Sequence, residues 1–461
     1  MDFCKVERLI YKYVCEYARH ITKQLLEQTD HELMKTRDKK RLRLKDSIKT
    51  SIKTLYGEVE YKRRYYFDGN SGEYIFLLDQ EMGISKVGLF SDNMAKLIVN
   101  ECLNESFRKA ANDISNATDQ SISSVGAWKL VQRVGQNIAT EEEQRMSDMD
   151  RGIMLGAKTV DVLFQEADGV WLNMQKNKKA APKMELKIAT VYEGWKDNKR
   201  KELINKKCIA GMENGSKFMH RREAYIRSIY NYDDIRIKLL NGDGAVWIKD
   251  DNVTYHQLDQ FHMFQEITRK IPVASVRKRI LDAYYNKDIE GMLDCIDTYI
   301  NSIDTGNTKD KKVKNARELY TYLYNNKSGL IKYSEVIDMP VPEEGVVYRG
   351  MGVQENQNCT NITLRMKHGR MRWSEAGANN MAKALCSRAN GDLERHIEEV
   401  YGARIPLVLI RKRQKEIQES AGSIRDIIGK GDKYKALINK SLPILSTANN
   451  PASSLIRQLL N

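Results

Sequence analysis

The stretch Asn241-Gly-Asp-Gly-Ala-Val-Trp-Ile-Lys249 follows a segment, 234–240, in which branched apolar and basic residues alternate. Alternation with a period of two predicts a half-buried β-strand, and the glycines after it predict where the strand ends. Asp243 lies between Gly242 and Gly244, so its carboxylate would stand at a strand end with no large side chain beside it. A carboxylate in such a position can hold a metal ion.

A second segment ends in the same way. Residues 160–168 form a strand-like apolar run that closes on Asp168 and Gly169. We expect both acids at strand ends of one sheet, where they would belong to one site. An Asp-Gly pair after a strand is also a common turn signal, so either pair alone has a purely structural interpretation.

Composition and charge narrow the class of protein. The chain has 461 residues, enough for two to four domains, and its formal net charge of +14 favours a polyanionic partner such as nucleic acid or an anionic membrane. A hydrophobic content of 41% with only seven prolines predicts folded, helix-rich domains. The absence of a long apolar run or a signal-peptide core leads us to expect a cytoplasmic protein without a membrane span.

The potential metal ligands favour a hard cation. The seven cysteines are scattered without a Cys-x-x-Cys pair, which argues against a zinc ribbon or a disulfide framework. The histidines are scattered as well. Any metal should therefore be held by carboxylates.

The N-terminal region combines a helix with a basic segment. Apolar residues at helical spacing from residue 3 to about 36 predict one long amphipathic helix, which would serve packing or dimerisation. Residues 35–53 hold nine basic and two acidic residues, so we interpret them as a phosphate-contacting segment rather than an ordinary solvated face. The candidate DNA-binding residues there are Lys39, Lys40, Arg41 and Arg43.

Two further regions before residue 150 have the composition of a nucleic-acid surface. Segments 56–67 and 73–78, on either side of the turn 68–72, predict a small hairpin rich in tyrosine and arginine. Helices are expected from Asp92, from Ser106, and from Ser123 or Ser124, the last with Val125, Trp128, Val131 and Ile138 on its inner side. With Lys129 and Arg133 outside, the last two resemble a helix-turn-helix, although any helical hairpin gives this pattern.

Residues 151–274 predict a mixed α/β sheet. Candidate strands are 159–168, 170–175, 185–192 and 207–212, followed by a helix at 215–230 and by the strand that ends at Asp243. Asp259 and His262 then stand three residues apart on one helix face, which suits either a functional pair or a helix cap.

A helical stretch, 275–335, precedes a glycine-rich approach to a further helix that begins near Glu355. Glu355, Asn358, Ile362 and Met366 share one face of it, which would place a carboxylate where the helix meets the sheet. Arg365 and Lys367 follow, and their charge makes them candidates for holding DNA phosphates. Glu343 and Glu375 are rival acids.

Asp168, Asp243 and Glu355 together suit phosphodiester displacement. Two Mg²⁺ ions about 3.5 to 4 Å apart can stabilise the attacking and leaving oxygens, and they need oxygen ligands from separate directions. Mn²⁺ is expected to substitute for Mg²⁺.

Several motifs resemble the DDE transposases of bacterial insertion sequences, specifically the Lre-type group, an uncharacterised protein family. They cover roughly residues 50 to 380 and include Thr54-Leu-Tyr-Gly-Glu-Val, Arg63-Arg-Tyr-Tyr, Leu77-Leu-Asp, Glu166-Ala-Asp168-Gly, Gly242-Asp243-Gly-Ala-x-Trp-Ile-Lys, Leu258-Asp-x-Phe-His262 and Arg365-Met-x-x-x-x-x-x-Trp373-Ser-x-x-Gly. The motif around Asp243 and the motif that ends at His262 are the specific ones when they occur together.

The resemblance implies an RNase H-like catalytic core with a helical insertion, acting on the terminal inverted repeats of its own element. It implies Asp168, Asp243 and Glu355 as metal ligands, Asp259 and His262 as supporting residues, and a dimer or larger oligomer on the element ends and target DNA. The implied organisation is an N-terminal helix and basic segment (1–50), a β-hairpin region (51–90), a helix-turn-helix-like domain (91–150), the first part of the core (151–274), an all-α insertion (275–340), the last part of the core (341–390) and a C-terminal basic helical region (391–461).

Two other classes of protein are compatible with the same residues. A nuclease on the same fold would cut DNA without joining it. A non-catalytic DNA-binding protein would keep the basic segment but show no metal dependence.

Overall fold

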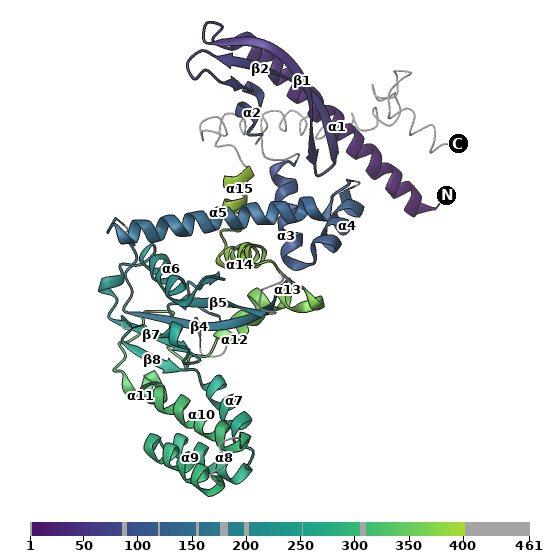
Figure 1. The fold of residues 1–461 in the computed structure, drawn as a ribbon. Coiled ribbons are helices and arrows are strands. Elements are labelled where there is room, and N and C mark those ends of the chain that lie inside the picture. The colour runs from purple at the N-terminus through teal and green to yellow at the C-terminus, as the bar shows by residue number, and fades with distance from the viewer. Residues whose placement is uncertain are drawn as a thin grey trace, which may run out of the picture. The chain divides into compact units, whose positions relative to one another are not determined.

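The computed structural model describes residues 2–84, 90–118, 120–153, 156–175, 183–197, 202–250, 252–304 and 310–401 (Figure 1). The chain divides into two compact units, one of Met1–Leu130 with Glu394–Asn461 and one of Val131–Leu393. None of the helices in these described ranges is long and apolar enough to cross a membrane. Of the predicted C-terminal region, 391–461, the structure describes 391–401, which include α15 (Leu393–Tyr401), and the rest lies outside the described residues.

The first unit begins with a long helix on a small sheet. Helix α1 (Phe3–Thr36) matches the predicted helix. It packs on β1 (Leu42–Thr54), β2 (Gly57–Asp68) and the short β3 (Tyr74–Ile75), which form an antiparallel sheet in that order. The shared core holds Leu26 from the helix with Ile52, Val59 and Tyr61 from the strands.

The predicted hairpin is only partly correct. The long hairpin joins β1 to β2 through a turn before Gly57, whose φ of +127° suits glycine. The predicted pairing around 68–72 exists, but it comprises only two residue pairs, and 77–82 form helix α2 (Leu77–Met82) rather than a strand. Strand β1 also continues across residue 50, where the sequence placed a boundary.

Three helices follow near the predicted positions: α3 (Asp92–Asn104), α4 (Phe107–Thr118) and α5 (Ser124–Asp150). Ser91, not Asp92, caps α3, and Ser123 caps α5 by accepting a bond from the Gly126 amide at 3.0 Å. The predicted inner side of α5 is wrong at its start, because Val125 and Trp128 are exposed. The buried residues lie on the neighbouring face of the helix and are Ala127, Leu130, Val131, Val134 and Ile138.

The second unit contains the expected mixed sheet. Its strands are β4 (Val162–Asn173), β5 (Lys183–Tyr192), β6 (Lys207–Gly211), β7 (Ile237–Gly242) and β8 (Tyr255–Leu258). The order is β6-β5-β4-β7-β8, with antiparallel pairing among the first three and parallel pairing of β4 with β7 and of β7 with β8.

Strand β4 corrects the prediction of two strands separated at Asp168. Asp168 and Gly169 lie within one continuous strand, opposite Ile188 and Lys187 of β5. The glycine serves packing here instead of a turn, because a Cβ at this position would lie 2.2 Å from the Glu185 carboxylate. Asp168 therefore stands in the body of the sheet.

Helices cover both faces of this sheet. Helix α6 (Gly215–Arg227) packs its Phe218 against Ala167 and Leu240 on one face. The opposite face, which carries Phe164 and Leu239, is covered by the segment around α11 (Tyr333–Val336). The candidate site lies on this second face.

The predicted helical stretch after the sheet forms several helices with a core of their own. They are α7 (Gln260–Lys270), α8 (Ala274–Tyr285), α9 (Ile289–Ile303) and α10 (Lys311–Asn325), and their core includes Ile280, Ile296 and Leu319. The chain then returns to the sheet through α12 (Gln354–Gln357), a π-helical turn (Asn358–Thr363) and α13 (Leu364–Met366) before α14 (Glu375–Asn390).

Candidate active site

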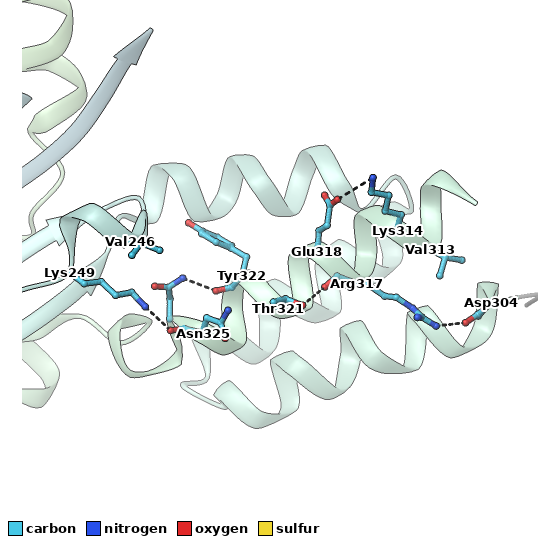
Figure 2. Close-up of a pocket in the computed structure, with 12 residues that line it drawn as sticks. Val246, Lys249, Asp304, Val313, Lys314, Arg317, Glu318, Thr321, Tyr322 and Asn325 are labelled. Atoms are coloured by element: carbon cyan, nitrogen blue, oxygen red, sulfur yellow. Dashed lines mark hydrogen bonds and ion pairs between the residues drawn. The ribbon is translucent and has the colours of Figure 1, made fainter. Parts of the chain in front are cut away.

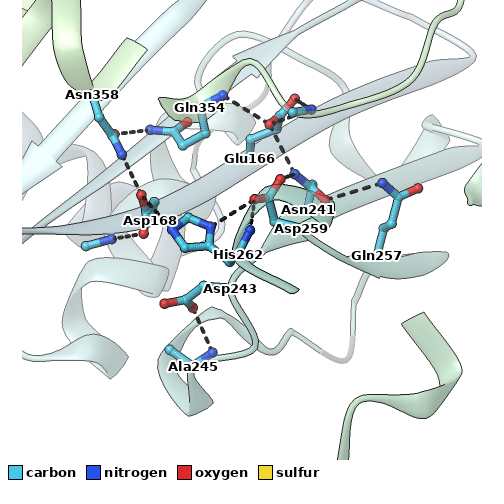
Figure 3. Close-up of polar contacts among 12 residues, drawn as sticks. Glu166, Asp168, Asn241, Asp243, Ala245, Gln257, Asp259, His262, Gln354 and Asn358 are labelled. Carbon is cyan, nitrogen blue, oxygen red and sulfur yellow. Dashed lines mark hydrogen bonds and ion pairs between the residues drawn. The ribbon is translucent and has the colours of Figure 1, made fainter. Parts of the chain in front are cut away.

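Asp168 is presented by the middle of β4 and is 7% exposed (Figure 3). One carboxylate oxygen accepts a hydrogen bond from the Gly169 amide at 2.7 Å, and the other accepts one from the Asn358 side chain at 2.6 Å. The strand therefore meets the π-helical turn at this acid. π-Helical turns of this kind are frequent at functional sites.

Asp243 immediately follows β7, as predicted. Its side chain accepts a hydrogen bond from the Ala245 amide at 2.8 Å, and its carbonyl oxygen accepts one from the Tyr322 hydroxyl at 2.9 Å. Gly244 has a φ of +85°, which lets the chain turn sharply after the acid. The loop is thus held both by its own turn and by helix α10.

Glu355 stands in the first turn of α12 and is exposed. Ligand atoms of Asp168, His262 and Glu355 all lie within 4.8 Å of one another. Neither rival acid, Glu343 nor Glu375, belongs to this group. The structure therefore favours Glu355 over both of them as the third acid.

His262 completes the group through Asp259. Asp259 caps α7 by accepting from the His262 amide, and its carboxylate also bonds the imidazole Nδ1 at 2.8 Å. The other ring nitrogen lies 3.9 Å from Asp168. The helix-cap interpretation is confirmed, and the same pair also faces the acids (Figure 3).

Burial shifts the pKa values of these groups. Burial raises the pKa of Asp168 to about 6, with the nearby carboxylates of Asp243 and Glu355 adding to the rise. Burial likewise raises the pKa of Asp243. The hydrogen bond to Asp259 raises the pKa of His262 to about 9, so the imidazole is positively charged at neutral pH.

The donor set fits a hard divalent cation. Three carboxylates from separate elements lie near the His262 imidazolium, and the crowded, largely buried Asp168 and Asp243 would gain stability when a cation neutralises them. Asp168 and Glu355 offer oxygen atoms close together, while Asp243 is near enough to raise the pKa of Asp168. Oxygen ligands of this kind suit Mg²⁺ or Mn²⁺.

Sequence reasoning missed Glu166 and Asn241. Each stands two residues before a candidate acid, and alternate residues of a strand share a face, so this spacing was an available signal. Glu166 is fully buried and accepts hydrogen bonds from Tyr192, Asn241 and the backbone before Glu355. Asn241 also donates to Asp259 at 3.0 Å.

The candidate DNA-binding residues differ in their exposure and in their partners. Lys39, Lys40 and Arg43 are exposed, but the guanidinium of Arg41 bonds both carboxylate oxygens of Asp68, at 2.9 and 2.6 Å. Lys129 and Arg133 are both exposed on α5, and Lys367 is exposed after α13.

The prediction for Arg365 is wrong. Its side chain is 3% exposed and lies over the ring of Trp373, at 5.4 Å from the ring centroid. A guanidinium buried in this way cannot reach a DNA phosphate.

A cavity of about 750 Å³ lies beside the loop that follows Asp243 (Figure 2). Its walls include Val246 and Lys249 from the loop and Arg317 and Tyr322 from α10. Arg317 pairs with Asp304 at 2.6 Å. Because Tyr322 also bonds the carbonyl of Asp243, the cavity and the acid share a wall.

Comparison with known proteins identifies the family. Residues 1–401 match the model of an uncharacterised protein family, UPF0236, and the chain belongs to that family. Relatives from Caldanaerobacter subterraneus subsp. tengcongensis include UPF0236 protein TTE2489, 22% identical over 91% of this chain and 84% of the relative. UPF0236 protein TTE0402 is also 22% identical, over 91% of this chain and 78% of its own length.

Proposed function

We propose that this protein is a DDE transposase that binds the ends of its insertion sequence and catalyses metal-dependent DNA strand cleavage and strand transfer. The observation that carries the proposal is the proximity of Asp168 on a strand, Glu355 on a helix and Asp243 after a strand end, the last close enough to raise the pKa of Asp168. Asp168 and Glu355, which lie far apart in sequence, come within ligand distance of a common point.

The sheet topology supports an RNase H-like core. Three antiparallel strands are followed in sequence by two strands parallel to the first, in the order β6-β5-β4-β7-β8. This order and these directions support an RNase H-like sheet, and α8 to α10, close to the predicted 275–340, would then be the insertion before the helix with the third acid.

The relatives' names also favour a mobile element. One relative, 23% identical over 91% of this chain, has eleven numbered designations in its name, and another has four. Multiple designations of one form suit a protein encoded many times in one genome, as a transposase would be. The net charge of +14 is compatible with a DNA substrate.

Asp168, Asp243 and Glu355 would hold the metal ions. Bound Mg²⁺ would supply positive charge at the reacting phosphate and ease deprotonation of the attacking water or 3′-hydroxyl. The protein's own contribution is to hold these carboxylates from three directions, on a strand, after a strand end and on a helix. The charged His262, oriented by Asp259, lies beside Asp168 on the same side.

The direct test is strand cleavage and joining on duplexes that carry the element ends, with Mg²⁺. We expect Asp168→Asn, Asp243→Asn and Glu355→Gln each to lower cleavage by at least about 100-fold while DNA binding stays intact. Glu375→Gln is the matched control, an acid in the first turn of α14 that is expected to leave cleavage unchanged.

The products separate the remaining classes of protein. Cleavage with joined products supports the transposase, whereas cleavage without joining would indicate a nuclease on the same core. Full cleavage by any one acid variant would remove that residue from the site.

A further inference from the structure

We propose that Glu166 is the positioning residue of the metal site: it anchors the chain before Glu355 to the strands that carry Asp168 and Asp243. The inference rests on the proposed metal site but assigns a role to a residue outside the three acids. Glu166 lies on the same face of β4 as Asp168, two residues before it, and is fully buried (Figure 3).

The first group of contacts joins Glu166 to the start of α12. The amide of Gly352 donates to one carboxylate oxygen at 3.0 Å, and the amides of Val353 and Gln354 donate to the other at 3.0 and 3.2 Å. First-turn amides have no partner within their own helix. The carboxylate therefore fixes the backbone from which the next residue, Glu355, projects.

The second group of contacts joins Glu166 to the neighbouring strands. The Tyr192 hydroxyl on β5 donates to it at 2.6 Å, and the Asn241 side chain on β7 donates at 3.2 Å. Asn241 stands two residues before Asp243 and also donates to Asp259, the partner of His262. One carboxylate on the strand of Asp168 thus bonds the elements that carry Asp243 and Glu355, and it is linked to Asp259 through Asn241.

All five of these groups donate hydrogen bonds, which matches a carboxylate because an ionised carboxylate only accepts. Its oxygens are occupied by these donors, so Glu166 orients the site instead of binding the ion. A glutamine has the same shape but turns an NH₂ group toward donors. Glu166→Gln should therefore displace the start of α12 without creating a cavity.

The experiment measures Mn²⁺ affinity of the full chain by titration calorimetry in the absence of DNA. We expect Glu166→Gln to raise the Kd for Mn²⁺ by about tenfold or more, as expected for loss of a residue that orients metal ligands. Tyr192→Phe leaves every charge in place and removes one bond to the same carboxylate, so we expect a smaller rise, about threefold. A raised Kd in this variant would come from lost positioning, because no negative charge has been removed.

Gln165→Met is the matched control. Gln165 is the adjacent residue of β4, is equally buried and faces the other side of the sheet. A Kd within about twofold of the wild type is expected for it, because its side chain lies on the face of the strand away from the acids and orients no metal ligand. Thermal unfolding of each variant checks that it is folded.

Asp168→Asn distinguishes the failure of this inference from the failure of the proposed site. Mn²⁺ binding that is absent in the wild type, or unchanged in Asp168→Asn, would overturn the metal site itself. Binding that Asp168→Asn abolishes but that Glu166→Gln and Tyr192→Phe leave at the wild-type Kd would overturn only the role of Glu166. If Glu166→Gln does not fold, Tyr192→Phe decides, and an unchanged Kd in it would overturn the proposal.

Discussion

At the scale of single residues, Gly244 joins the loop of Asp243 to helix α10. Its φ is +85°, and an added Cβ would lie 2.8 Å from the Asn326 side chain. We expect Gly244→Ala to lower the free energy of unfolding by about 1 to 3 kcal/mol through backbone strain, with a further loss from that close approach. Chemical denaturation measures the change.

Gly345→Ala provides the control for this substitution. Gly345 has a similar φ of +82°, but a Cβ there would have no neighbour within 4 Å among the described residues. Gly345→Ala should therefore show only the strain contribution and keep strand cleavage. Equal losses of stability in the two variants would show that the approach to Asn326 has no effect.

His256 predicts a pH dependence of stability. Burial lowers its pKa from 6.5 to about 4, with Lys249 and Arg222 adding to the shift. The folded protein disfavours the charged imidazole of His256. The contribution of the neutral side chain to the free energy of unfolding is therefore complete above pH 6.5. It is lost as the pH falls from 6.5 toward 4, by up to about 3 kcal/mol.

Denaturation at several pH values, with His256→Gln beside the wild type, measures this contribution. The variant cannot titrate, so its stability should fall less steeply between pH 6.5 and 4. Parallel curves for the two proteins over this range would contradict the assignment to His256.

Single residues also show how much of the candidate site can be predicted from the sequence. The prediction from apolar runs that close on an acid and a glycine is confirmed for the strand that ends before Asp243, whereas Asp168 stands inside a strand that continues to Asn173. Arg365 was assigned to DNA from its charge, yet it lies against Trp373, because charge does not reveal which face of a short helix is covered. Glu166 was missed because its two-residue spacing from Asp168 shows only that the two share a strand face, and its hydrogen-bond partners lie far away in the sequence.

At the scale of elements, Arg221 of α6 links several helices of the second unit. It is 4% exposed and pairs with Glu142 and Glu143 of α5 at 2.8 Å, and with Glu213 at 2.6 Å. Lys383 of α14 also pairs with Glu142. Arg221→Leu would leave the buried Glu142 and the half-buried Glu213 short of a partner, so we expect a loss of about 3 to 5 kcal/mol in stability.

Arg227→Leu on the same helix is the comparison. Arg227 pairs with Glu223 and Asp233 near the surface, where an ion pair contributes about 0 to 1 kcal/mol. Urea unfolding of both variants gives the difference. A similar loss from Arg221→Leu and Arg227→Leu would mean that the buried network does not hold these helices together.

Element predictions succeeded where the pattern was long and failed where glycine had a packing role. The amphipathic pattern of α1 extends over 34 residues and gave both ends of the helix correctly. Gly169 resembled a turn residue but only makes room for Glu185 within β4. The hairpin of β1 and β2 was missed because its charged strand lacks clear alternation, and Gly57 alone marks its turn.

At the scale of the whole molecule, the net charge of +14 predicts salt-sensitive DNA binding. Lys39, Lys40 and Arg43 are exposed in the first unit. We expect their combined substitution by alanine to weaken binding of the full chain and to reduce the slope of log K against log salt by about 0.9 for each phosphate that is no longer neutralised. Fluorescence anisotropy across a salt series measures the slope.

Lys278→Ala serves as the control, since this exposed lysine of α8 belongs to a different unit. An equal change of slope in the control, or no change in the triple variant, would show that 39–43 do not bind the DNA. The sequence predicts DNA binding there through charge alone.

The measurement that tests the central claim most directly is Mg²⁺-dependent strand cleavage of DNA taken from both flanks of the protein's own coding region, comparing wild type with Asp243→Asn. The account predicts cuts at one defined position in each flank by the wild type, and their loss in the variant with DNA binding retained. Equal cutting by both proteins, or tight binding without any cutting by the wild type, would contradict it.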